Sequence, residues 1–154
     1  NVVRTMSRIV RSAETVGDVP PLNHIPRTKR GVISYSANDI ANRLNAKAIV
    51  TFTTTGDTAR RVARLHPDLP LLVFTPVQQV RSQLAITWGA ETFLCREVHS
   101  TDDMIQVVDE QLLAMDEYNE GDTMVVVAGT PPGVAGTTNT IHVHQLGEDT
   151  RQGQ

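Results

Sequence analysis

Between residues 47 and 129 the sequence alternates short apolar runs with segments of helical periodicity, and this alternation restricts the fold more than any other feature. Four runs have the length and composition of buried strands: KAIVTF, PLLVFT, AETFLC and TMVVVAG. In the last intervening segment the residues of one helical face are Ile105, Val108, Leu112 and Met115, and Ser100 and Asp103 are spaced as in a capping box. Buried strands that alternate with helices predict a parallel sheet covered on both faces.

A fifth apolar run, TNTIHVHQL, follows the fourth with no helical segment between them. A loop must therefore return this strand antiparallel, at the edge of the sheet. We expect an α/β domain of three layers, in which helices flank a five-stranded mixed sheet of order 3-2-1-4-5 and strand 5 is antiparallel. The crossovers should be right-handed.

The two ends of the chain differ from this alternating region. Residues 1–15 place Val3, Met6, Val10 and Ala13 at helical spacing, and residues 16–30 have the prolines and glycines of a linker. The first helix starts at residue 1 without a capping residue, so we expect the chain to be part of a longer one. A helix over roughly Ser36–Leu44 should open a domain of residues 31–148, followed by a disordered tail at 149–154.

Composition excludes several classes of function. The net charge is -3 and acids and bases are interleaved, which argues against a nucleic-acid partner. No apolar run is long enough to span a bilayer, so we expect no membrane partner. The single cysteine, Cys95, excludes an internal disulfide and fits a cytoplasmic location.

Two loops follow the carboxyl ends of predicted neighbouring strands, where ligands bind in open α/β sheets. The first, Thr53–Thr58, offers threonine hydroxyls, a glycine and the free backbone N–H groups of a helix start, all suited to an anion. The alternative is that Asp57 or Thr55 only caps the helix. The second loop, Gly129–Thr140, is long and rich in Gly, Pro and Thr, and it is either functional or a flexible return to the edge strand. Together the two loops favour a phosphate site.

The other candidate residues carry weaker signals. His142 and His144 share one face of a strand and could bind metal, but no third ligand is evident, so surface or interface histidines are favoured. Cys95 is interpreted as a core residue. The isolated histidines, expected to be solvated, are His24, His66 and His99. No catalytic constellation and no metal site is predicted.

Three motifs resemble the C-terminal regulatory domain of pyruvate kinase, over about residues 31–148. They are AIVTFTTTGDTARRVARLHPDLPLLVFT, YNEGDTMVVVAGTPPGVAGTTNTIHV and, before the domain, VVRTMSRIVRSAE, which resembles the last helix of that enzyme's (β/α)₈ barrel. The resemblance implies allosteric control, with one loop holding the phosphate of an effector and the other closing over it. The implied effector-binding residues are Thr53, Thr54, Thr55, Gly56, Asp57, Thr58, Gly133, Val134, Ala135, Gly136, Thr137 and Thr138.

The chain departs from the family at positions that bear charge. Family members that respond to fructose 1,6-bisphosphate often have lysine in place of Thr54 and a basic residue in place of Asp57. They often carry a Trp-Arg pair in place of Thr130 and Pro131. Less positive charge favours a ligand with one phosphate, such as glucose 6-phosphate or AMP.

The resemblance also implies partners and a parent reaction. The parent transfers a phosphoryl group between phosphoenolpyruvate and ADP with Mg²⁺ and K⁺, and its catalytic residues lie in the barrel, so this fragment should be inactive and hold no cofactor itself. Pyruvate kinases are tetramers, and the predicted edge strand Thr140–Leu146 contains no proline or lysine to block pairing with a second copy. The alternative is a stand-alone phosphate-binding or assembly domain without a kinase partner.

Overall fold

The computed structural model describes residues 2–16 and 26–148 of the chain. Its elements are α1 (Val2–Val16), α2 (Lys29–Arg43), β1 (Ala48–Phe52), α3 (Asp57–Ala63), β2 (Leu71–Thr75), α4 (Gln78–Leu84), β3 (Ala90–Leu94), α5 (Thr101–Leu112), β4 (Thr123–Gly129) and β5 (Thr138–Gln145). Within the described residues no helix is both long and apolar enough to cross a membrane.

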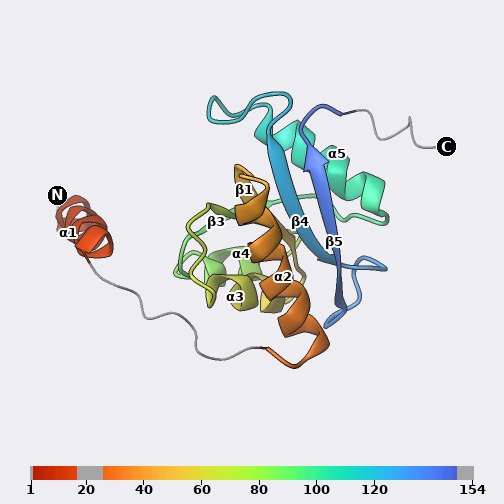
Figure 1. Ribbon diagram of the computed structural model, residues 1–154, viewed down its shortest axis with the longest axis horizontal. Helices are drawn as coiled ribbons and strands as arrows, with labels where there is room; N and C mark the ends of the chain where they lie inside the picture. Colours follow the sequence, from red (N-terminus) through yellow and green to blue (C-terminus); the bar gives the residue numbers. More distant parts are fainter. Residues whose placement is uncertain (1, 17–25, 149–154) are drawn as a thin grey trace.

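The five strands form one sheet in the order β3-β2-β1-β4-β5 (Figure 1). β1 pairs in parallel with β2 and β4, and β2 pairs in parallel with β3. β5 runs antiparallel to β4 at the edge. The predicted strand order and the antiparallel edge strand are therefore confirmed.

Helices cover both faces of this sheet, because alternate side chains of each strand point to opposite faces. On one face Ile49, Val73 and Val125 pack with α2, α3 and α4. On the other face Val50, Leu72 and Val126 pack under α5. Every residue of β1 and β2 is buried, as expected for strands covered on both sides. The predicted three-layer α/β class is confirmed.

Two helix starts differ in detail from the sequence prediction. α2 begins at Lys29, not near Ser36, because the Thr28 hydroxyl accepts a hydrogen bond from the Gly31 N–H at 3.2 Å and caps the helix there. At the start of α5 the Ser100 hydroxyl caps Asp103 N, but the Asp103 carboxylate accepts from His99 N at 2.9 Å, one residue before the position of a standard capping box.

The N-terminal segment lies apart from the sheet (Figure 1). All fifteen residues of α1 are exposed, including Val3 and Met6 of its apolar stripe. Val16 belongs to α1 and Lys29 to α2, so the predicted linker of residues 16–30 is too long at both ends. Residues 17–25 of that linker and the predicted tail, 149–154, lie outside the described residues.

The edge strand carries a feature that the sequence did not predict. His142 and His144 share one face, as expected, with their ring centroids 6.2 Å apart. His144 is only 2% exposed, and its Nε2 lies 2.7 Å from Oδ1 of Asp109. The expectation of a surface or interface histidine is wrong for His144, because α5 packs over this face of β5 and supplies a hydrogen-bonding partner.

Candidate functional site

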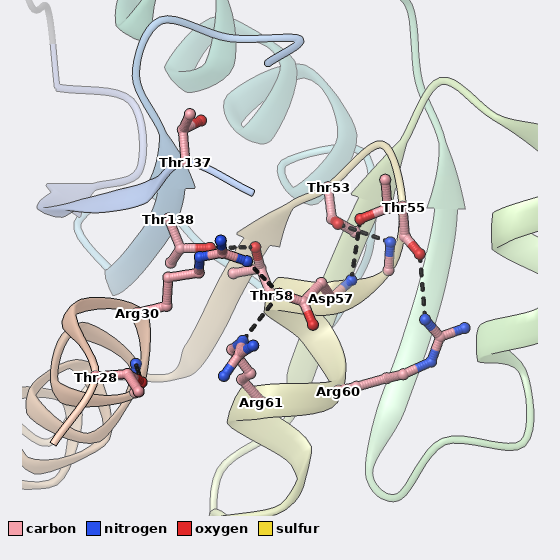
Figure 2. Close-up of polar contacts among 12 residues, drawn as sticks. Thr28, Arg30, Thr53, Thr55, Asp57, Thr58, Arg60, Arg61, Thr137 and Thr138 are labelled. Atoms are coloured by element: carbon pink, nitrogen blue, oxygen red, sulfur yellow. Dashed lines mark hydrogen bonds and ion pairs between the residues drawn. The ribbon is translucent and has the colours of Figure 1, made fainter. Parts of the chain in front are cut away.

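The two predicted loops meet beside the carboxyl ends of β1 and β4. The hydroxyls of Thr58 and Thr138 are 2.8 Å apart, and both side chains are buried (Figure 2). One hydroxyl donates a hydrogen bond to the other across a separation of 80 residues in the sequence. This bridge joins the start of α3 to the start of β5.

The first loop is held by its own hydrogen bonds. The Thr53 hydroxyl accepts from Gly56 N at 2.8 Å, and the Thr55 hydroxyl lies 3.5 Å from Asp57 N, at the limit of a hydrogen bond. Gly56 is the N-cap residue of α3, with φ of 83° and no side-chain capping bond. The alternative in which Asp57 or Thr55 caps α3 is therefore wrong, because the capping position belongs to a glycine.

Asp57 is engaged by two arginines instead. Its Oδ2 accepts from Arg61 Nε at 2.9 Å and from Arg30 Nη1 at 3.4 Å (Figure 2). The hydrogen bond from Arg61, with smaller contributions from Arg30, lowers the pKa of this carboxyl below its usual value, so Asp57 is charged at neutral pH. A third arginine, Arg60, donates to the Thr55 carbonyl oxygen at 3.2 Å and fixes the backbone of the loop.

The second loop is fastened at its base. Thr130 N donates to Asn139 Oδ1 at 2.8 Å, and Asn139 Nδ2 donates back to the Thr130 carbonyl oxygen at 2.7 Å. Near the tip, the Thr137 hydroxyl donates to the Val134 carbonyl oxygen at 2.7 Å. The tip itself is exposed, with Val134 at 52%.

The two loops enclose a cavity of about 490 Å³, within the size range of small-molecule sites. All the predicted binding residues line it except Gly56, the N-cap residue of α3. Gly129 and Pro132 of the second loop also line the cavity, as does His99, which was expected only to be solvated. The lining residues that the sequence did not single out are Phe52, Pro76, Val77, Glu97, Val98 and Met104.

Comparison with known proteins assigns the family. The profile described as pyruvate kinase, alpha/beta domain, matches residues 32–144. The chain belongs to the pyruvate kinase family. This confirms the resemblance inferred from the motifs.

Relatives named pyruvate kinase match nearly the whole chain. That of Corynebacterium glutamicum is 75% identical over 151 residues, covering 98% of this chain and 32% of the relative. That of Mycobacterium tuberculosis is 61% identical over 148 residues, covering 96% of this chain and 31% of the relative. That of Clostridium acetobutylicum is 34% identical over 146 residues, covering 92% of this chain and 31% of the relative. The chain thus spans about a third of the length of these relatives.

A third segment of this pyruvate kinase domain, between β3 and α5, completes the cavity wall. Cys95 N donates to the Thr75 carbonyl oxygen at 3.0 Å, and His99 N donates to Asp103, so the segment is held at both ends. Between these points it presents Glu97 and His99 to the cavity. Because β1, β2 and β3 are parallel, the carboxyl end of β3 lies at the same end of the sheet as that of β1. This position was the one sequence signal that could have placed the segment at the site. A single Glu and a single His form no recognisable motif.

The remaining predicted candidates lie elsewhere. Cys95 is half-buried against the core under α5, as predicted for a core residue, and burial raises the pKa of its thiol. His66 is exposed and stacks on Trp88 with ring centroids 4.5 Å apart. His24 lies outside the described residues. Among residues 2–16 and 26–148, no three His, Cys, Asp or Glu side chains are grouped as a metal site requires.

Proposed function

We propose that this chain is the effector-binding domain of a pyruvate kinase and that its cavity binds a metabolite carrying one phosphate group. The observation that carries the proposal is the cavity of about 490 Å³ between two Thr/Gly loops, joined at their base by the Thr58–Thr138 hydrogen bond. Threonine hydroxyls and loop N–H groups bind a phosphate without adding charge, and a cavity of this size accommodates the rest of a small metabolite.

The charges at the cavity wall favour one phosphate over two. Thr54 and Asp57 stand where family members that respond to a bisphosphate often have basic residues. Both Asp57 and Glu97 line the cavity, whereas none of the described lysines or arginines does. A second phosphate would meet repulsion there, so glucose 6-phosphate and AMP are favoured over fructose 1,6-bisphosphate.

For the whole protein we propose the family's reaction, phosphoryl transfer between phosphoenolpyruvate and ADP, in the glycolysis of the cytoplasm. Residues 1–15 would be the last helix of the catalytic barrel, whose surface would cover the exposed apolar stripe of α1. Residues 31–148 would form the regulatory domain, joined to the barrel by the linker. The Mg²⁺ and K⁺ of the reaction belong with the barrel, and the purified fragment should form no pyruvate from phosphoenolpyruvate and ADP.

Calorimetric titration of the chain with glucose 6-phosphate and AMP tests the binding proposal. Thr55→Ala removes a hydroxyl from the cavity wall and should weaken binding about ten-fold, because a hydrogen bond to a charged group contributes roughly 1.5–3 kcal/mol. Thr15→Ala is the matched control, since Thr15 is an exposed threonine of α1 whose hydroxyl donates to Ser12. Equal affinities in the wild-type chain and Thr55→Ala would contradict the proposed site.

A second role, in assembly, is favoured by the position of β5. This strand is an edge of the sheet, and Val143 is 45% exposed on it. We propose that β5 pairs with the same strand of a second copy, so that one sheet extends across two subunits. Val143→Lys should place like charges near the two-fold axis and shift sedimentation toward monomer, whereas Leu94→Lys, on the opposite edge strand, should not. A dimer that tolerates Val143→Lys would count against strand pairing.

A further inference from the structure

A carboxylate at the wall of a proposed phosphate site is unexpected, and Asp57 is placed in such a position. Asp57 lines the cavity, while one of its oxygens, Oδ2, accepts hydrogen bonds from both Arg30 and Arg61. Neither arginine lines the cavity. The two residues best suited to hold a second phosphate are therefore adjacent to the site but bound to an internal anion.

Arg30 connects Asp57 with the other wall of the cavity. It comes from the first turn of α2, 27 residues before Asp57. A Cβ placed on Gly136, in the second loop, would lie 3.2 Å from its guanidinium nitrogens. Figure 2 shows Arg30 extending from α2 toward Asp57, beside Thr138. This guanidinium therefore lies against both loops while remaining outside the cavity.

Neither arginine is locked in this position by burial. The side chain of Arg30 is 44% exposed and that of Arg61 is 30% exposed. The Arg30–Asp57 contact, at 3.4 Å, is longer than the Arg61–Asp57 contact, at 2.9 Å. Each arginine makes its side-chain hydrogen bond to Asp57, so a change at Asp57 would let either side chain adopt another rotamer. The carboxylate is what directs them to their present positions.

We propose that Asp57 determines the ligand specificity of this cavity by holding Arg30 and Arg61 out of it, so that one phosphate is accepted and a second is refused. The inference rests on the proposed function, because it concerns the same cavity. With Asp57 in place, the carboxylate offsets part of the positive charge beside the cavity. Without it, both guanidinium groups are free to donate to a phosphate, and Arg30 is near enough to the second loop to act when that loop contacts a ligand.

Titration of the chain and Asp57→Asn with glucose 6-phosphate and fructose 1,6-bisphosphate tests this. Asp57→Asn should raise the affinity for the bisphosphate by about ten-fold, because the released arginines can donate charge-assisted hydrogen bonds and the carboxylate no longer repels the second phosphate. The affinity for the monophosphate should rise less. Adding Arg30→Gln to Asp57→Asn should remove part of the gain. The gain should also shrink as salt concentration rises.

The chain supplies a matched control. Asp39 and Arg43 form the same kind of i,i+4 ion pair on α2, with Arg43 Nε 2.8 Å from Asp39 Oδ2, and neither residue lines the cavity. Asp39→Asn should leave the ratio of the two affinities unchanged. A thermal unfolding curve of each variant confirms that the compared proteins are folded.

The outcomes separate this inference from the proposed function. If the wild-type chain binds glucose 6-phosphate and Asp57→Asn leaves the ratio of affinities unchanged, the specificity role is overturned and the binding site stands. If no phosphorylated ligand binds wild type or variant, both are overturned. Arg30→Gln alone offers an independent check should Asp57→Asn fail to fold. It should leave glucose 6-phosphate binding unchanged, and a ten-fold loss would show that Arg30 is already a ligand and would overturn the inference.

Discussion

The two loops that enclose the cavity are similar in composition but are held very differently. In the first loop, Thr53–Thr58, the Thr53 hydroxyl, the Arg60 guanidinium and the Thr58–Thr138 bridge each fix one part of the backbone. In the second, Gly129–Thr140, the pair of hydrogen bonds between Thr130 and Asn139 holds the base, and the tip from Gly133 to Gly136 is exposed.

This difference indicates how each loop can contribute to binding. Donors on a fixed loop require little ordering when a ligand arrives, so the first loop can supply affinity at low entropic cost. The exposed tip of the second loop is held by fewer contacts, so it would lose more conformational freedom on binding, and this entropic cost offsets part of the affinity it supplies. We therefore expect perturbation of the first loop to have larger effects than comparable perturbation of the second.

The largest effect is expected from Gly56→Ala. Gly56 has a φ of 83°, and an added Cβ would lie 3.2 Å from Leu84 Cδ2 and 3.0 Å from Arg60 Nη1. The left-handed backbone and the crowding against a buried leucine should together lower the free energy of unfolding by about 2–4 kcal/mol. Urea unfolding measures the loss, and calorimetry should show weakened phosphate binding in the variant. A loss no larger than that of the same change at Gly133 would break the comparison.

Thr58→Val should have the next largest effect. Valine keeps the shape of the side chain but leaves the buried Thr138 hydroxyl without its partner, at a cost of about 1–3 kcal/mol in the free energy of unfolding. The control is Thr140→Val in the second loop. This change removes hydrogen bonds to Thr130 and Asn139, but those partners are partly exposed and can bond to water instead. Equal losses for the two variants would show that the bridge has no special role.

The sequence predicted the fold because the signals for it are local. Apolar runs such as Ala48–Phe52 and the helical spacing of Ile105, Val108 and Leu112 are properties of neighbouring residues, and they correctly identified the strands and the helix. The missing helix between the last two apolar runs correctly placed the fifth strand as an antiparallel edge. The two Thr/Gly loops were recognisable for the same reason, since each follows a strand directly. Both line the cavity, although ligand binding there stays a prediction.

The features that the sequence did not predict depend on residues far apart in the chain. The Arg30–Asp57 pair spans 27 residues and the His144–Asp109 pair spans 35, and neither pairing follows from periodicity. The early start of α2 depends on one threonine cap, Thr28, which lies among the prolines and glycines that predicted a linker. Such contacts are decided by packing between elements, which a single sequence does not specify.

Gly133→Ala should have a smaller effect than the two changes in the first loop. Gly133 has a φ of 81°, close to that of Gly56, but an added Cβ would have no heavy atom within 4 Å. Only the backbone penalty remains, and the exposed tip can relax, so the loss in the free energy of unfolding should be about 1 kcal/mol. Urea unfolding of Gly56→Ala and Gly133→Ala side by side separates the cost of crowding from the cost of the backbone conformation.

The smallest expected effect is the pH dependence of the stability that the Asp57 ion pairs contribute. The second loop, Gly129–Thr140, contains no ionisable side chain and should show no such dependence. The arginines, Arg61 most strongly, hold the folded-state pKa of Asp57 below the usual value of 3.8. Their stabilisation is therefore fully present from about one pH unit above 3.8 and is lost as the pH falls through 3.8 to the lower folded-state value. Asp57 is 41% exposed, so the stabilisation should be under about 1 kcal/mol.

The free-energy difference between the wild-type chain and Asp57→Asn, measured by urea unfolding, should be constant above about pH 5 and shrink below that. The loss caused by Asn139→Ala at the base of the second loop should not depend on pH over this range, and parallel pH profiles for the two variants would show that Asp57 is not the titrating group.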